Sequence, residues 1–133
     1  MGYMSDVLIA VAFSTKEHRD EVLAVYRMDL RVKEHNLAEA WQTYDGGEYP
    51  VLWYQNHGVK WYDGYESVEG IEHMIDVASD FADERGLHYA SLQLRVGEDM
   101  TDIENAERHT NGDMMSFLWQ LCDVERTIVH KFN

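Results

Sequence analysis

The chain has little cysteine and little proline, and each shortage excludes a class of architecture. A single cysteine, Cys122, among 133 residues excludes an internal disulfide and is typical of a protein from a reducing compartment. A single proline, Pro50, and the lack of any serine- and glycine-rich tract leave no predicted linker. We therefore predict one domain over residues 1–133, long enough to bury a core.

Long apolar runs are also missing. The longest run, Val7–Phe13, is far too short to cross a bilayer. No lysine or arginine precedes it, although a signal peptide begins with positive charge. These patterns predict a cytoplasmic protein that has no membrane partner.

Positive charge is scarce. The sequence has 25 Asp plus Glu against 11 Lys plus Arg, which gives a formal net charge of -14. This charge disfavours direct binding to nucleic acid or anionic membrane, because both are polyanions. A hydrophobic content of 45% argues against disorder despite the charge. The partners that this composition favours are basic proteins, cations or neutral ligands.

Motifs of catalysis, metal binding and cofactor binding are missing as well. There is no nucleophile elbow and no phosphate-binding glycine loop, and the seven histidines lack the spacing that places two ligands on one helix face. The acidic stretch 97–104 does not match the calcium-loop pattern. We predict no catalytic residue, metal or cofactor, although acid–base pairs assembled from separate strands would leave no linear trace.

The most prominent feature that is present is an amphipathic acidic segment. Its apolar residues recur at helical spacing: Val68, Ile71, Met74, Ile75, Ala78, Phe81 and Ala82. Its acids are Glu69, Glu72, Asp76, Asp80 and Asp83, which we call the acidic stripe. At about 100° per residue the stripe covers an arc of roughly 80°, opposite an apolar arc of roughly 140°. Ser67 is the predicted N-cap of this helix and Gly86 its C-terminal stop.

The acidic stripe has two interpretations. One is a solvated face, the ordinary fate of charged residues. The other is a binding surface for a positive partner, because Arg85 is the only cation in the segment and the like charges repel along it. Nucleic-acid mimicry is a further possibility. The acids lie roughly 5 Å apart along the axis, whereas one DNA strand has a phosphate about every 3.4 Å. A mimic would therefore also need nearby acids: Glu66, Glu98, Asp99, Asp102 and Glu104.

Aromatic residues gather in the segment from Tyr49 to Tyr65. Asn56-His57-Gly58 is typical of a hairpin turn between strands 49–55 and 59–65, with a register that depends on which two residues form the loop. An exposed half of these aromatics would suit an interface, and we expect a homodimer through an uncovered sheet face. Trp53 and Trp61 are the candidate anchors. A rival hypothesis is a ligand pocket between the sheet and three upstream aromatics, which are Trp41, Tyr44 and Tyr49.

The remaining patterns complete a fold prediction. Val7–Phe13 is predicted to be a central strand covered on both faces. Ser14 and Glu17 have capping-box spacing before a helix whose inward residues would be Val22, Tyr26 and Leu30, with Leu37 and Trp41 left open.

Towards the C-terminus we predict a strand at 88–96, a short helix at 101–108 and a final strand at 124–132, with 113–121 either helix or strand. The order favours an α+β domain with a mostly antiparallel sheet and helices on one face, of ferredoxin-like topology.

Two stretches, LRVGEDMTDIEN at 94–105 and LCDVERTIV at 121–129, resemble the C-terminal part of small proteins encoded by tailed bacteriophages. The resemblance implies expression in an infected bacterial cytoplasm and a role in manipulating host machinery. The hypothesis from sequence is thus a non-catalytic acidic inhibitor of a basic host protein that handles nucleic acid or defends the cell. The alternative is a small ligand-binding domain or enzyme.

Overall fold

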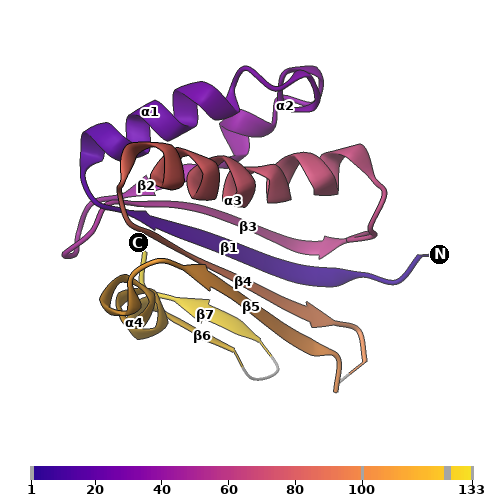
Figure 1. Ribbon diagram of the computed structural model, residues 1–133. Coiled ribbons are helices and arrows are strands. Elements are labelled where there is room, and N and C mark those ends of the chain that lie inside the picture. Colours follow the sequence, from indigo (N-terminus) through magenta and orange to yellow (C-terminus); the bar gives the residue numbers. More distant parts are fainter. Residues whose placement is uncertain (1, 100, 125–126, 133) are drawn as a thin grey trace.

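The computed structural model describes residues 2–99, 101–124 and 127–132, and its centre is a five-stranded antiparallel sheet of order β2-β3-β1-β4-β5 (Figure 1). The strands are β1 (Ser5–Phe13), β2 (Gln42–Tyr44), β3 (Val51–Val59), β4 (Tyr89–Gly97) and β5 (Ile103–His109). β1 pairs antiparallel with β3 on one side and with β4 on the other, and β2 pairs antiparallel with the outer side of β3. It follows that β1 and β2 run parallel with β3 between them, and that β3 and β4 run parallel with β1 between them. Two interlocked β-α-β units of this kind make a ferredoxin-like core, which confirms the predicted class and topology.

Helices cover both faces of this sheet. The elements on one face are α1 (Lys16–Tyr26), α2 (Leu30–Glu34), the 3₁₀ helix η1 (Leu37–Ala40) and α3 (Glu66–Arg85). The elements on the other face are α4 (Gly112–Leu121) and the hairpin of β6 (Cys122–Val124) and β7 (Ile128–His130). The expectation of helices on one face therefore holds for α1–α3 and is wrong for α4. None of the helices in the described ranges is both long and apolar enough to cross a membrane.

The residues of β1 explain why both faces need cover. Val7, Ile9 and Phe13 point into the core beneath α1 and α3, whereas Leu8 and Ala10 point into the core above α4. All of them are fully buried, as predicted for a central strand. The sheet face on which we expected a homodimer is covered by the chain's own C-terminal segment, so that face is not available to a second copy.

The first helical region differs from the prediction in its caps. Thr15 is the N-cap of α1, because its hydroxyl accepts from the His18 N–H at 3.0 Å. Ser14 instead donates to the His88 carbonyl at 3.1 Å, so the predicted capping box of Ser14 and Glu17 does not form.

The first helix is also shorter than the spacing of its apolar residues predicts. α1 ends at Tyr26, and Asp29 caps α2 by accepting from the N–H groups of Arg31 and Val32. Leu30, predicted to face inward, is 72% exposed because it begins α2 on the solvent side. Two residues left open by the sequence, Leu37 and Trp41, are buried.

The predicted hairpin at Asn56-His57-Gly58 is wrong. β3 continues through these residues and pairs with β1 along its length. The register changes between the pairs Ser5↔Val59 and Val7↔Asn56, which leaves one extra residue on β3, a β-bulge. Gly58 takes a φ of 60° at the bulge, and its N–H donates to Asp6 at 2.8 Å. Local sequence cannot separate a bulge glycine from a turn glycine, because both need positive φ.

Five more predictions can be compared from α3 onward. Gly86 ends α3 with a φ of 64°, as expected, but Tyr65 occupies the N-cap position in place of Ser67 and its side chain makes no cap. The predicted short helix at 101–108 is strand β5, and 113–121 lies in helix α4. The final strand divides into β6 and β7, while residues 125–126 of that prediction lie outside the described residues.

Candidate functional site

Helix α3 has the two faces that its sequence predicts. The seven apolar residues that define its inner face are all buried: Val68, Ile71, Met74, Ile75, Ala78, Phe81 and Ala82. This burial fixes the rotation of the helix, because its apolar arc must face the sheet. The acidic stripe consequently lies on the outer side, where neighbouring elements decide what each acid contacts.

The acidic stripe is not one uninterrupted line of free charge. Glu69 pairs with Arg31 of α2 at 3.3 Å, and Asp76 pairs with Arg108 of β5 at 2.8 Å. Glu72 accepts a hydrogen bond from the Gln93 amide of β4 at 2.9 Å. Arg85 is the only cation within the segment itself, but cations from other elements lie beside Glu69 and Asp76.

Asp80 and Asp83 behave differently. Both are exposed, and within the described part of the chain neither has an ion pair or a side-chain hydrogen bond. Because no contact inside the fold requires their charge, they are the two stripe residues most available to a partner.

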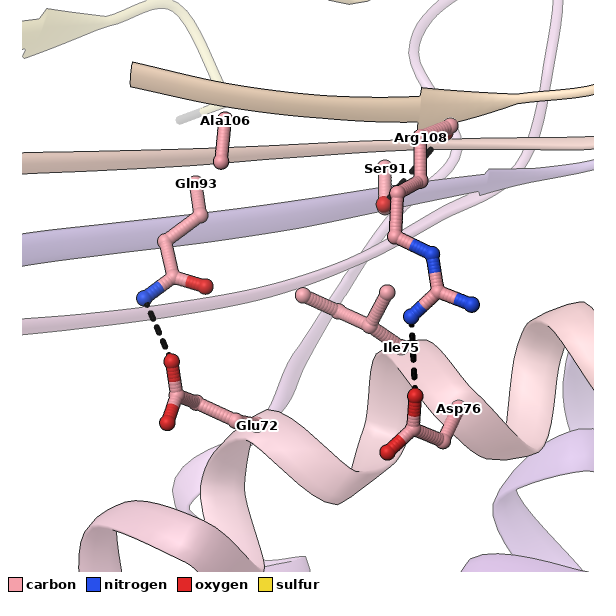
Figure 2. Close-up of a pocket in the computed structure, with 7 residues that line it drawn as sticks. All are labelled: Glu72, Ile75, Asp76, Ser91, Gln93, Ala106 and Arg108. Atoms are coloured by element: carbon pink, nitrogen blue, oxygen red, sulfur yellow. Dashed lines mark hydrogen bonds and ion pairs between the residues drawn. The ribbon is translucent and has the colours of Figure 1, made fainter. Parts of the chain in front are cut away.

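A groove runs between α3 and the strands β4 and β5, because β5 extends the sheet beyond the cover of the helix. We call it the α3–β5 groove. Figure 2 shows one part of it, a pocket of about 290 Å³ in which Gln93 and Arg108 reach from the sheet to Glu72 and Asp76 on the helix. An adjoining pocket of about 380 Å³ shares Glu72 and Gln93 and adds Trp61. The groove is thus a polar cleft bridged by two hydrogen-bonded contacts.

Arg95 forms the charged end of this groove. Its side chain is 13% exposed and hydrogen-bonds Asp102 at 2.7 and 3.1 Å, Glu104 at 2.7 and 3.2 Å, and the Ser5 hydroxyl at 2.9 Å. The hydrogen bonds that Arg95 donates to Glu104, and then those it donates to Asp102, raise the pKa of Arg95 above its usual range. These bonds use all five N–H donors of a guanidinium, so Arg95 holds the groove together and has no donor left for an anionic ligand.

The groove is lined mainly by carboxylates, amides and aromatic rings. Ser91 is buried and its hydroxyl donates to the Arg108 carbonyl at 3.4 Å. Among the described residues that line the two pockets there is no histidine, cysteine or lysine that could act as a base for this serine. What the lining offers is carboxylate oxygen, amide and aromatic surface, which suits hydrogen-bond donors and cations.

The two tryptophan candidates have different positions. Trp53 is 5% exposed and stacks on Phe132 at a centroid distance of 5.6 Å in the core above α4, so its prediction as a partner anchor is wrong. Its indole N–H is buried without a hydrogen-bond partner in the described structure. Trp61 is half-buried, contacts the Tyr54 ring at 6.1 Å and lines the groove, so it remains a candidate.

The rival pocket predicted beside Trp41, Tyr44 and Tyr49 does not form. Trp41 belongs to the core beneath α1 and α3, whereas Tyr44 and Tyr49 pack against the core on the opposite face of the sheet. Side chains on opposite faces of a sheet cannot line one pocket.

The additional acids that a nucleic-acid mimic would need are engaged locally. Glu66 pairs with His35, and Glu98 accepts from the Met4 N–H at 2.6 Å. Asp99 accepts from Thr101 at 3.0 Å, and this contact lowers the pKa of Asp99. The last two, Asp102 and Glu104, pair with Arg95 as described above.

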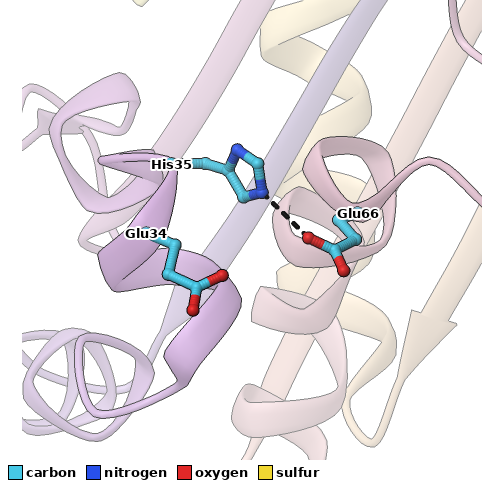
Figure 3. Close-up of side chains that lie close together, drawn as sticks. All are labelled: Glu34, His35 and Glu66. Atoms are coloured by element: carbon cyan, nitrogen blue, oxygen red, sulfur yellow. Dashed lines mark hydrogen bonds and ion pairs between the residues drawn. The ribbon is translucent and has the colours of Figure 1, made fainter.

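One group with metal-ligand chemistry comes from the junction of α2 and α3. Figure 3 shows Glu34, His35 and Glu66, whose potential ligand atoms all lie within 4.8 Å of one another. The His35 Nε2 atom is 3.1 Å from a Glu66 oxygen. All three side chains are exposed, so their proximity is explained by one surface hydrogen bond between His35 and Glu66. Sequence spacing could not find this group, because its members lie on two separate elements.

His18 is a buried titratable residue outside the groove. It is 3% exposed, its Nδ1 accepts from the Ser14 N–H at 3.2 Å, and its ring stacks on Phe81. Its Nε2 atom is buried with no partner in the described structure. Burial lowers the pKa of His18 below its usual value of 6.5, so folding favours the neutral form of this ring.

We expect the free energy of unfolding to fall as the pH drops below the ordinary pKa of histidine. The unfolded chain then binds a proton at position 18 that the folded chain resists, so the stability contribution present at higher pH is lost in acid. His18→Asn should make this dependence shallower, whereas the matched change His109→Asn at an exposed strand position should leave it unchanged. Denaturant titrations across the pH range measure both slopes, and identical slopes for the two variants would contradict the assignment.

Comparison with protein-family models, with curated proteins and with solved structures returned no match. The function of this chain is therefore to be inferred from the geometry of α3 and the α3–β5 groove.

Proposed function

We propose that this protein is a non-catalytic acidic binding protein that presents the outer face of α3 to a basic partner. The observation that carries the proposal is the exposure of Asp80 and Asp83 without a cation partner among the described residues. The net charge of -14 adds a long-range negative field that would steer a positive partner to this face.

The partner class that suits this face is a host protein that handles nucleic acid, such as a defence nuclease. Such proteins carry positively charged channels for phosphates, and a rigid helix with outward carboxylates can occupy part of such a channel. The resemblance of 94–105 and 121–129 to phage-encoded proteins supports an inhibitor acting in the bacterial cytoplasm. Mimicry of a whole duplex has less support, because three of the five stripe acids contact neighbouring elements.

The test compares two double variants of equal charge. Asp80→Lys/Asp83→Lys changes the available stripe acids, and the matched control Glu39→Lys/Glu48→Lys changes two exposed acids elsewhere; each pair moves the formal charge from -14 to -10, because every substitution adds 2. Immobilised proteins are incubated with bacterial lysate, and bound proteins are eluted with a salt gradient. We expect the wild type and the control to retain a basic nucleic-acid-handling protein that elutes as salt rises, and the α3 variant to lose it.

Retention of that partner by the α3 variant and by the control alike would contradict the proposed face. Circular dichroism of both variants provides the folding control, since none of the four acids forms an ion pair with another described residue. No partner for the wild type at any salt concentration would favour the second candidate function.

That second candidate is a small-ligand site in the α3–β5 groove. The favouring observation is the pair of adjoining pockets of about 290 and 380 Å³, which fall at the lower end of the size range of ligand sites. Trp61 at one end would report occupancy. Ligand-dependent quenching of its fluorescence, lost in Trp61→Phe and insensitive to ionic strength, would identify this function.

A further inference from the structure

Strand β5 leaves a long open edge on the sheet. It borders the sheet beside β4, and no described strand pairs with its outer side (Figure 1). Six of its seven residues are exposed and Ile103 is partly buried, whereas β4 is mostly buried. The opposite edge strand, β2, has three residues. An exposed edge of full strand length is a template for pairing with another strand.

The direction of the backbone groups on β5 follows from two hydrogen bonds at its ends. The Gly97 N–H donates to the Asp102 carbonyl at 2.8 Å, and the Thr110 N–H donates to the Tyr89 carbonyl at 3.1 Å. Backbone groups alternate along an antiparallel strand, so even-numbered residues between these ends bond to β4. The N–H and carbonyl groups of the odd-numbered residues, Asn105 and Glu107 among them, therefore point outward from the sheet.

The side-chain sequence of this edge is complementary to itself. If two β5 strands pair antiparallel over all seven residues, position 104 faces position 108 of the second copy and Ala106 faces itself. Glu104 would then lie opposite Arg108 on both sides of the two-fold axis, with the small Ala106 side chains at the axis. Cross-strand opposite charges stabilise antiparallel pairs, and like charges destabilise them.

We propose that the β5 edge is a homodimer interface, in which two copies join into one ten-stranded sheet with Ala106 at the two-fold axis. The outward groups of Asn105 pair with those of Glu107 of the second copy. This register is favoured over its neighbours on two grounds. Centring the pair on Glu107 would place two carboxylates opposite each other, and centring it on Asn105 would shorten the overlap.

The interface also changes the α3–β5 groove. Ala106 and Arg108 line this groove, and Glu104 lines its adjoining pocket. In the dimer, Arg108 gains Glu104 of the second copy in addition to its own Asp76, and the grooves of the two copies meet at the axis. Pairing through β5 leaves the covered faces of the sheet undisturbed, unlike the face-to-face dimer expected from sequence.

The first experiment uses charge reversal and mixing on the full chain. Sedimentation is run at moderate salt, where screening weakens the repulsion between two copies of charge -14. We expect a dimer with twice the 15.6 kDa chain mass. Glu104→Arg places Arg opposite Arg, and Arg108→Glu places Glu opposite Glu, so each variant alone should be monomeric. An equimolar mixture restores both opposite-charge pairs and should restore the dimer.

The second experiment fixes the register and stands even if a charge variant folds poorly. Ala106→Cys should form an intermolecular disulfide fastest, because facing residues of a non-hydrogen-bonded pair lie about 4.5 Å apart between Cα atoms. Asn105→Cys and Glu107→Cys are the matched controls for the two shifted registers. The native Cys122 is buried, which raises the pKa of its thiol to about 12 and keeps it unreactive.

Faster cross-linking at 105 or 107 would overturn the proposed register. A chain-mass monomer with no cross-link at any of the three positions would overturn the β5 interface. Neither result depends on Asp80 or Asp83, so failure of the dimer is distinguishable from failure of the proposed function.

Discussion

Replacing Leu8 by alanine should lower the free energy of unfolding by about 2–5 kcal/mol, the range for a buried leucine truncated in a packed core. Leu8 is fully buried and belongs to the core cluster that contains Met114 and Leu118 of α4. The lost side chain would leave a cavity that the sheet cannot close, because both neighbours of β1 hold it in register. Denaturant titration followed by circular dichroism measures the loss.

Leu30→Ala is the matched control for this prediction. It removes the same atoms from a side chain that is 72% exposed, so we expect a change within about 0.5 kcal/mol. The comparison tests whether α4 and the β6–β7 hairpin bury the second face of the sheet. Equal effects of the two substitutions would mean that this face is not a packed core.

Replacing Arg95 by methionine should lower the free energy of unfolding by about 2 kcal/mol. This value is smaller than that of a fully buried ion pair, because solvent reaches the partner carboxylates and screens the interaction. The guanidinium ties Ser5 of β1 to Asp102, which precedes β5, and to Glu104 of β5. Methionine fills much of the space but supplies no donor, so Asp102 and Glu104 are left as neighbouring like charges. Arg27→Met, at an exposed site without an ion pair in the described structure, is the control.

The acid dependence of this effect provides a second readout. The hydrogen bond from Arg95, followed by that from Tyr3, lowers the pKa of Asp102 below its usual range. The contribution of this carboxylate is therefore present above the ordinary pKa of aspartate and is lost as the pH falls through the lowered value. The difference in unfolding free energy between the wild type and Arg95→Met should narrow in acid. If the difference in unfolding free energy stays constant from neutral to acidic pH, the ion-pair explanation is wrong.

Local sequence patterns predicted the elements whose apolar residues repeat with a clear period or form an unbroken run. Val7–Phe13 is an unbroken apolar run, and it forms the fully buried centre of β1. The apolar spacing from Val68 to Ala82 and the glycine at position 86 predicted both the inner face and the end of α3. In each case the hydrophobic period repeats often enough to fix the element and its orientation.

Predictions failed where one residue type serves two geometries. Gly58 needs positive φ in a turn and in a bulge alike, and pairing with the long strand β1 selected the bulge.

The stretch from Ile103 to His109 is polar and almost wholly exposed, so it has no apolar alternation to mark it as a strand. Its strand form comes from backbone pairing with β4, which a side-chain pattern does not record.

In the candidate site, some features follow from local sequence and others from tertiary contacts. The amino-acid sequence by itself determined the charge of -14, the amphipathic α3 and the outward position of its acids, because these depend on composition and on the helical period. The tertiary structure decided which acids stay available, since Arg31 and Arg108 reach Glu69 and Asp76 from other elements. It also decided that Trp53 is core, that Trp61 lines a groove, and that β5 presents an open edge. Such contacts join residues far apart in the chain, and their partners are set by sheet order and register, which no local pattern encodes.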